Sequence, residues 1–314
     1  MELNYLILAH KNPLQVKRLI LSLESEETSF YIHIDLQASI DEFKQVLLLP
    51  NIYFLNKRYK GTWGDIGIVK ATLYGMQEIS RNTKKGYCIL LSGQDYPLVS
   101  RQKIKDLLKE KFPTEFLTVY PMPHFGWKYG GMDRLEKYKI IKSKKRKHFL
   151  QLPSIFDKEF YSLETFGKLN FLRKNRRFQE MSLVLKKRKF PNYLKAYGGS
   201  QWWALTMETT IQILNYVDKH LDYLEYHKYS LLPDEIFFHS ILMQLQEEKT
   251  EKISIEKSFT YVNWERPETP LPVTFEEQDF NELQKASKNY LFARKFDIKL
   301  DSEILDAIDK KLLQ

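Results

Sequence analysis

Polar residues that could bind a ligand follow several strand-like segments in the first third of the sequence. His10, Asp35 and the pair Gln94 and Asp95 each come at or just after the end of a short apolar run. In an open parallel sheet the carboxyl ends of the strands meet at one edge, and ligands bind beyond that edge. The spacing therefore predicts that these four residues lie near a nucleotide site.

A carboxylate suited to proton transfer occurs later in the chain. Glu235 follows Pro233 and Asp234, and proline is typical of a helix start. Acidic residues in a first helical turn also stabilise the helix dipole, which is the alternative interpretation. If Glu235 faces a ligand, it can act as a general base that takes the proton of a hydroxyl group.

Two adjacent cations, Arg294 and Lys295, lie in a short apolar frame near the end of the sequence. Arginine offers a planar fork to phosphate oxygens and lysine offers a point charge, so the pair could neutralise a departing diphosphate. The alternative is an ion pair between one of them and a local carboxylate such as Asp297. The sequence contains no Asp-x-Asp pattern of the kind that holds a divalent metal at a strand end. We therefore expect no metal and no other cofactor.

Alternating strand-like and helix-like segments must position these residues. Strands are expected at 5–9, 30–35, 52–55, 87–91, 115–119 and 259–264, and helices at 13–23, 66–79, 103–109, 208–217, 235–246, 276–287 and 302–313. The alternation predicts an α/β fold with a Rossmann-like, mostly parallel central sheet flanked by helices. We expect one domain in three parts, which are a nucleotide-binding half at 1–124, a basic helical insertion at 125–190 and an acceptor and catalytic half at 191–314.

The positive charge of the chain is concentrated in the predicted insertion. Residues 137–189 hold 17 Lys and Arg against 4 Asp and Glu, an excess of 13, so the remainder carries −4 of the net +9. An anionic membrane surface, a pyrophosphate-bearing substrate or nucleic acid could bind such a surface, and a merely solvated face is the fourth interpretation. No nucleic-acid-binding motif accompanies the charge, so we expect no nucleic acid partner.

Targeting signals give a further expectation. Residues 1–10 lack the features of a signal peptide, and no apolar run approaches the ~18–20 residues that cross a bilayer. The single cysteine, Cys88, excludes a disulfide within the chain and makes a cysteine-based zinc site implausible. We expect a cytoplasmic protein with peripheral contact to the inner face of the membrane.

Taken in order, the motifs Ile32–Asp35, Leu91–Leu98, Gly199–Leu205 with Pro233–Phe238, and Leu291–Asp297 resemble those of the core-2/I-branching enzymes of glycosyltransferase family 14. This family includes β-1,6-N-acetylglucosaminyltransferases and peptide xylosyltransferases. The resemblance implies a GT-A-like fold, a UDP-sugar donor and inversion at the anomeric carbon.

The resemblance also implies roles for particular residues. Glu235 corresponds to the catalytic base and Lys295, with Arg294, to the diphosphate ligands. The nucleotide pocket would include Ile7, Ala9, His10 and Asp35. The donor or acceptor sugar would lie near Trp63, Gln94, Asp95, Trp203, Trp264 and Arg134. Trp203 and Trp264 are candidates because a flat ring can stack on a sugar, and a buried core position is the alternative for both.

One segment departs from the family pattern. Some members place a basic residue before the penultimate helix as a further diphosphate ligand, but here residues 271–274 read Leu-Pro-Val-Thr. Arg294 or Arg266 is the candidate replacement.

Together these features predict an inverting, metal-independent transferase that forms a β-linkage, with UDP-GlcNAc as the favoured donor. The acceptor would be a glycan or lipid-linked oligosaccharide in bacterial surface polysaccharide synthesis, and residues 137–189 would contact the anionic membrane. The alternatives are UDP-xylose or UDP-galactose as donor, or a non-catalytic glycan- or membrane-binding protein.

Overall fold

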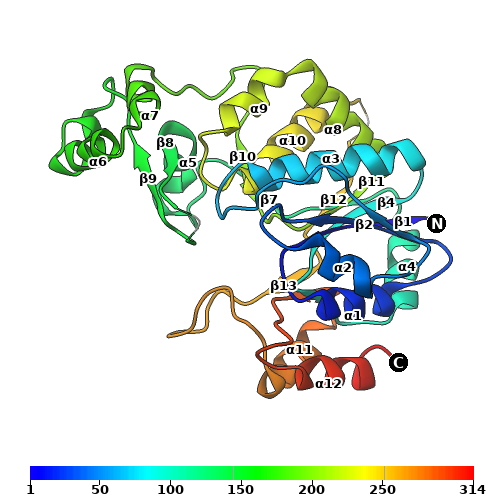
Figure 1. Ribbon diagram of the computed structural model, residues 1–314. Helices are drawn as coiled ribbons and strands as arrows, with labels where there is room; N and C mark the ends of the chain where they lie inside the picture. The colour runs from blue at the N-terminus through cyan, green and yellow to red at the C-terminus, as the bar shows by residue number, and fades with distance from the viewer. Residues whose placement is uncertain (144, 251) are drawn as a thin grey trace.

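A mixed sheet forms the centre of the computed structural model, which describes residues 1–143, 145–250 and 252–314 (Figure 1). Within these residues the sheet has seven strands in the order β12-β6-β11-β4-β1-β2-β3. They are β1 (Leu3–Ala9), β2 (Thr28–Ile34), β3 (Ile52–Phe54), β4 (Tyr87–Ser92), β6 (Glu115–Phe116), β11 (Ala204–Thr206) and β12 (Ile255–Glu256). β1 to β4 are parallel, whereas β11 runs antiparallel between β4 and β6. The predicted mostly parallel sheet is confirmed, and the antiparallel β11 was not predicted.

Helices cover both faces of this sheet, as the alternating side chains of β1 require. Leu6 packs into a core with the helices of one face, while Tyr5 and Ile7 pack into a second core with the helices of the other. The first face is covered by α3 (Gly67–Asn82), α8 (Met207–Lys219) and α10 (Phe237–Glu248), with α9 (Leu221–His227) beside them. The second is covered by α1 (Pro13–Leu23), α2 (Ile40–Val46), α4 (Arg101–Glu110), α11 (Phe280–Ala286) and α12 (Glu303–Lys311). The predicted α/β layering is therefore confirmed.

A second, smaller sheet joins the end of the chain to the central sheet. β5 (Asp95–Pro97) follows β4 after a tight turn, and it pairs antiparallel with β14 (Phe292–Arg294). β14 also pairs in parallel with β13 (Thr260–Val262). In this register Arg294 lies opposite Asp95, at the carboxyl end of β4.

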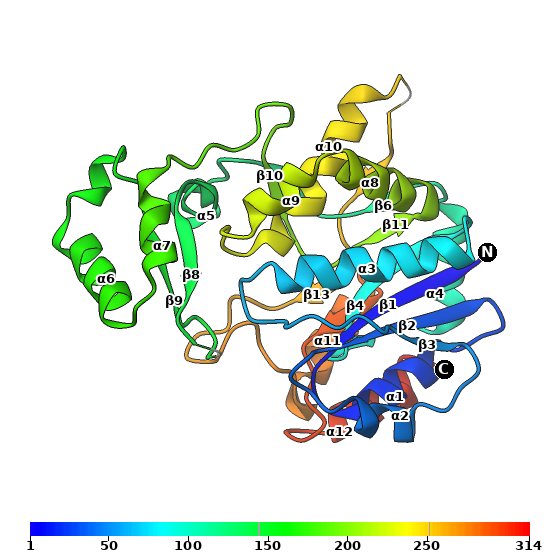
Figure 2. The same cartoon turned by 45° about the horizontal axis from the view of Figure 1, so that its top comes forward.

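The basic insertion stands apart from the body in both views (Figures 1 and 2). The antiparallel ribbon of β7 (Val119–Pro121) and β10 (Tyr197–Gly199) leads the chain out of the body and back. The insertion contains α5 (Asp133–Glu136), α6 (Leu163–Lys174) and α7 (Phe178–Ser182), and also a hairpin of β8 (Tyr138–Ile141) and β9 (Phe149–Leu152). The hairpin, α6 and α7 share a small apolar core of their own. The helices were predicted and the hairpin was not.

Candidate active site

Glu235 lies at the end of a 3₁₀ turn, η4 (Pro233–Glu235), just before α10 begins at Phe237. The residue before the turn, Leu232, has a left-handed backbone with φ of 52°, which is uncommon for a non-glycine residue. Its N–H donates a hydrogen bond of 3.2 Å to the carbonyl of Gly64. Gly64 itself has φ of 73°, and a Cβ there would lie 3.0 Å from the Leu231 side chain. The Trp63-Gly64-Asp65 segment thus supports the turn that carries Glu235.

The carboxylate of Glu235 is held by Arg134, which was predicted to face the acceptor. The Arg134 guanidinium donates to one carboxylate oxygen, Oε2, at 2.5 Å, and it lies 3.9 Å from the ring centre of Trp127. Desolvation raises the pKa of Glu235, and the Arg134 charge opposes that rise. The neighbouring Asp234 is buried, and both burial and the Glu235 charge raise its pKa. A desolvated carboxylate with one oxygen held in place is suited to accept a proton at the other.

A buried lysine from the insertion also contacts this turn. Lys139 of β8 is fully buried, donates to the Gly64 carbonyl at 3.2 Å and forms an ion pair with Asp65. Burial lowers the pKa of Lys139, and the charges of Asp65 and Asp234 oppose that fall. Lys139 was not predicted as a site residue, because the sequence pattern does not reveal the hairpin that carries it.

Arg294 lies between Asp95 and an aromatic ring. Its Nε is 3.0 Å from the Asp95 carboxylate, and its guanidinium carbon lies 4.0 Å from the ring centre of Trp202. Asp95 has no exposed surface, and its two oxygens also accept from the backbone N–H and the hydroxyl of Ser92 at 2.8 Å. The expected contact of Asp95 with sugar hydroxyls is therefore corrected, since this carboxylate orients Arg294 instead.

Lys295 lies among other cations. Burial lowers its pKa, and the charges of Arg146, Arg294 and Lys11 lower it further. The Asp297 carboxylate, considered above as a counter-ion, forms an ion pair with the Lys11 ammonium at 2.7 Å and accepts from the Asn12 side-chain amide at 2.6 Å. Among the described residues Lys295 forms no ion pair. Positive side chains that repel one another in this way favour the binding of an anion.

One electrostatic effect relates the cations to the carboxylates. Burial lowers the pKa of Arg294, and the negative charges of Asp95 and of Asp234 oppose that fall. Glu235 is the next residue along the chain after Asp234. That the base and the phosphate ligands act in one site stays a prediction.

The predicted nucleotide residues meet at the edge where β1 and β2 end. His10 is exposed, and desolvation and the Lys11 charge lower its pKa, against the charges of Asp35 and Asp297. The Asp35 carboxylate accepts from the backbone N–H of Gln37 at 2.7 Å and of Gly61 at 2.5 Å, which fixes the loop beside it. Ala9 is the last residue of β1.

Two other predicted residues have structural contacts. The side chain of Ile7 is fully buried in the core beneath the sheet. Gln94 is bound to Phe296 twice, through its side-chain amide at 3.1 Å and through its backbone carbonyl at 2.9 Å. Gln94 thus fixes the segment that follows Arg294 and Lys295.

The aromatic residues divide into exposed and buried rings. Trp203 is 1% exposed and packs against Phe238, so the prediction that it stacks on a sugar is corrected to a core position. Trp264 is 56% exposed on the loop that follows β13. Trp63 is half-buried, with its ring centre 5.9 Å from that of Phe149. Trp202 and Trp127, each beneath an arginine of the site, were missed.

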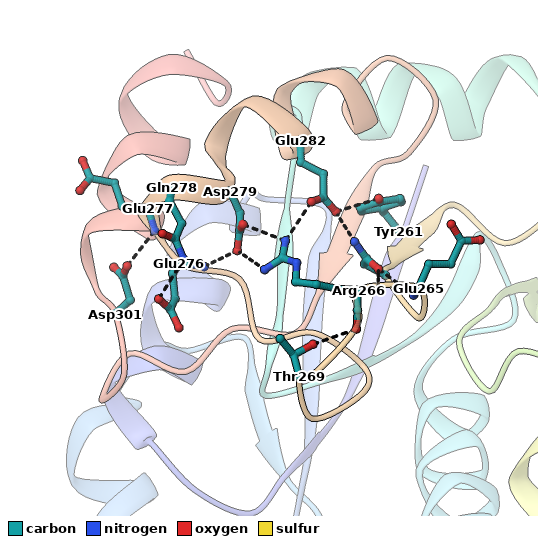
Figure 3. A network of polar contacts seen from close by, with 11 residues as sticks. Tyr261, Glu265, Arg266, Thr269, Glu276, Glu277, Gln278, Asp279, Glu282 and Asp301 are labelled. Carbon is teal, nitrogen blue, oxygen red and sulfur yellow. Dashed lines mark hydrogen bonds and ion pairs between the residues drawn. The ribbon is translucent and has the colours of Figure 1, made fainter.

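Arg266 does not reach the cation group. Its guanidinium binds Asp279 at 2.8 and 3.1 Å and Glu282 at 3.0 Å (Figure 3). Glu282 also accepts from Tyr261 and Asn263. The suggestion that Arg266 replaces the missing basic residue is therefore wrong, because two carboxylates already neutralise it.

Two further properties of the described residues concern metal binding and membrane spanning. In residues 1–143, 145–250 and 252–314, no cluster of three or more His, Cys, Asp or Glu is placed to hold a metal ion. In the same ranges no helix is long and apolar enough to cross a membrane.

One family model covers most of the chain. A family model described as "Branch: Core-2/I-Branching enzyme" matches residues 3–286. The chain is similar to xylosyltransferase 2 of Canis lupus familiaris, with 24% identity over 97% of this chain, and to xylosyltransferase oxt of Drosophila melanogaster, with 25% identity over 95%. It spans about a third of these relatives, 33% and 32% of their lengths. The solved structure of mouse xyloside xylosyltransferase 1 in its apo form aligns with a TM-score of 0.35 and 11% identity, over 93% of this chain and 97% of that one.

Proposed function

Because the chain belongs to the Core-2/I-Branching enzyme family, we propose that it is a glycosyltransferase that moves a sugar from a UDP-sugar to a hydroxyl group of a glycan. The proposal is supported by a desolvated carboxylate, Glu235, and by a group of cations that includes Lys295. A base and an anion site side by side are what displacement of a diphosphate by a hydroxyl group requires.

The proposed reaction is a direct displacement at the anomeric carbon. The free oxygen of Glu235 takes the proton of the acceptor hydroxyl, and the acceptor oxygen attacks C1 of the α-linked donor. The bond from C1 to the diphosphate oxygen breaks, and its electron pair leaves with UDP. Arg294 and Lys295 neutralise the negative charge that grows on UDP, and the product is β-linked. Asp95 and Trp202 hold Arg294 in position for this step.

Independence from metal ions is part of the proposal. Its support is the group of cations described above, since two fixed positive side chains can do for a leaving diphosphate what a divalent ion does. A Glu235 carboxylate bound to Arg134 rather than directed at the phosphates is consistent with this division of roles.

UDP-GlcNAc is the proposed donor, and UDP-xylose is the second candidate. UDP-xylose is supported by the relatives, several of which are named xylosyltransferases. UDP-galactose is a third candidate on the same fold and base. A thermal-shift screen of these nucleotide sugars separates them, because a ligand that binds only the folded state raises the unfolding temperature.

The acceptor is proposed to be a lipid-linked glycan at the cytoplasmic face of a bacterial membrane. The basic segment 137–189 supports this, because six of its large apolar side chains are exposed: Phe156, Tyr161, Leu163, Phe166, Phe178 and Leu185. Apolar and basic side chains together favour the surface of an anionic bilayer. A non-catalytic glycan- or membrane-binding protein remains the alternative, but a binder has no need of a desolvated base.

The proposal is tested with Glu235→Gln, assayed for sugar transfer in buffer that contains EDTA. The wild-type protein should transfer sugar, and the variant should lose at least ~100-fold in turnover, because the amide cannot accept the proton. UDP affinity, measured by calorimetry, should be nearly unchanged in the variant.

Each outcome of this experiment bears on one part of the proposal. Retained transfer by Glu235→Gln excludes Glu235 as the base. Complete loss of wild-type activity in EDTA, restored by Mn²⁺, contradicts the metal-free reaction.

A further inference from the structure

Arg146 reaches the body of the protein from the tip of the insertion hairpin. It lies in the turn between β8 and β9, and its Nη2 donates a hydrogen bond of 2.9 Å to the carbonyl of Leu271. Its guanidinium carbon lies 5.8 Å from the ring centre of Trp63. Figure 2 shows the loop that follows β13 extending to this hairpin tip. The side chain is exposed, so its remaining donors are accessible to a ligand.

The segment that Arg146 contacts lies directly beside Lys295. Two residues beyond Leu271, the carbonyl of Val273 accepts from the Lys295 N–H at 3.2 Å. The N–H of Phe275 then donates to the Lys295 carbonyl at 2.9 Å. Arg146 is thus placed next to the strand-like pairing that fixes Lys295. Consistent with this geometry, the Arg146 charge lowers the pKa of both Lys295 and Arg294.

No cation of the neighbouring segment can fill this position. Residues 271–274 carry no charge. Arg266, five positions earlier, is neutralised by Asp279 and Glu282 (Figure 3). Arg294 shares its charge with Asp95, so a further cation beside Lys295 would add to the positive charge available to a diphosphate. The hairpin supplies the missing charge through space.

We propose that Arg146 is a donor-phosphate ligand, which binds the diphosphate of the nucleotide together with Lys295. The inference deepens the proposed function and depends on it. It assigns the hairpin a direct part in donor binding, in addition to the membrane contact proposed for the rest of the insertion. An arginine fork can bind two phosphate oxygens at once, whereas a lysine contributes one charge.

The test measures UDP and uridine affinity by calorimetry for the wild-type protein, Arg146→Ala, Arg146→Lys and Lys147→Ala. Lys147 is exposed in the same turn, so its variant removes an equal charge without the contact described here. Arg146→Ala should weaken UDP binding ~10- to 100-fold, the range for loss of a charge-assisted hydrogen bond. The loss of UDP affinity should be smaller in Arg146→Lys, and it should be less than ~3-fold in Lys147→Ala. Uridine affinity should be the same in all four proteins, because uridine has no phosphate.

Three results would overturn the assignment. The first is that Arg146→Ala binds UDP as tightly as the wild-type protein does. The second is an equal loss of UDP affinity in Lys147→Ala, which would mean that Arg146 acts through the overall positive charge of the hairpin and not as a direct ligand. The third is unchanged UDP affinity with lost binding to vesicles containing a polyprenyl pyrophosphate, which would assign Arg146 to a lipid acceptor. A wild-type protein that binds UDP but transfers no sugar would count against the proposed function alone.

Discussion

Glu235 and Arg134 show how a residue's chemistry is set by its neighbours. Desolvation makes the carboxylate a stronger base, and the guanidinium that holds it makes it a weaker one. Trp127, beneath Arg134, keeps that guanidinium in place. The balance leaves the pKa of Glu235 above its ordinary value of 4.5.

This balance predicts the pH dependence of transfer. A base acts only when it is deprotonated, so the rate should fall as the pH drops through the raised pKa of Glu235. Arg134→Ala removes a charge that lowers this pKa, so the acidic limb of the profile should move to higher pH. The profile of kcat/KM, compared with that of Lys174→Ala in the exposed part of α6, measures the change. A limb that stays in place or moves to lower pH would contradict the assigned pairing.

At this scale the structure corrects two of the residue roles that the sequence predicted. Glu235, Arg294 and Lys295 were selected because their motifs follow the order of a known family, and their roles stay predictions. Asp95 was misassigned because its partner, Arg294, is distant in sequence. Trp203 was selected and its neighbour Trp202 was not, because a sequence does not say which of two adjacent rings faces the core.

Two short segments, at 63–65 and 232–235, form the element that positions the base. The hydrogen bond from Leu232 to Gly64 joins them, and Lys139 of β8 donates to the same carbonyl. The backbone of Gly64 adopts a left-handed conformation, which costs a residue with a side chain about 1–2 kcal/mol. The turn therefore depends on a glycine at this position.

Replacement of this glycine should both destabilise the protein and weaken transfer. Gly64→Ala should lower the free energy of unfolding by about 1–2 kcal/mol. The matched control is Gly167→Ala in α6, where a Cβ would meet nothing within 4 Å and the backbone is helical. That variant should gain about 0.5–1 kcal/mol, because alanine is the better helix former. Urea unfolding measures the free energy of unfolding of both variants. Equal effects in the two would contradict the need for a glycine at position 64.

Strands and helices could be predicted from the sequence where they contain a long run of buried apolar residues. The parallel strands β1, β2 and β4 and the helix α3 were found close to their observed bounds. The hairpin of β8 and β9 was missed because each strand has four residues and a basic turn separates them. β11 has three residues, and its antiparallel direction depends on pairing with β4, which no local pattern reveals.

At the scale of the whole molecule, the charge of the insertion has more than one use. Arg188 is buried and donates to the carbonyls of Lys137, Tyr226 and Tyr229, so it holds the insertion to the body. Lys139 donates to the Gly64 carbonyl, beside the turn that carries Glu235. Other basic residues of the insertion are exposed: Lys145, Arg146, Lys147, Lys158, Arg173, Lys174, Arg176, Lys186, Lys187 and Lys189.

The exposed residues predict binding to anionic vesicles that weakens with salt. Raising the salt to ~1 M shortens the screening length to about 3 Å and should release most of the protein. The double variant Leu163→Ser and Phe166→Ser should bind more weakly, since both side chains are exposed in α6. Leu48→Ser, at an exposed position outside the insertion, is the control. Sedimentation with vesicles measures each protein, and binding to labelled RNA in place of vesicles would contradict the prediction.

The pairing of Arg294 with Asp95 has a consequence for the order of events during synthesis. The two residues face each other on β14 and β5, although they lie about 200 positions apart, and such distant contacts form late. The parallel strands β1 to β4 emerge from the ribosome first and can assemble early. The Arg294 guanidinium meets Asp95 only when β14 has been made and inserts between β13 and β5. The parallel strands are therefore translated well before the nascent polypeptide can orient this arginine.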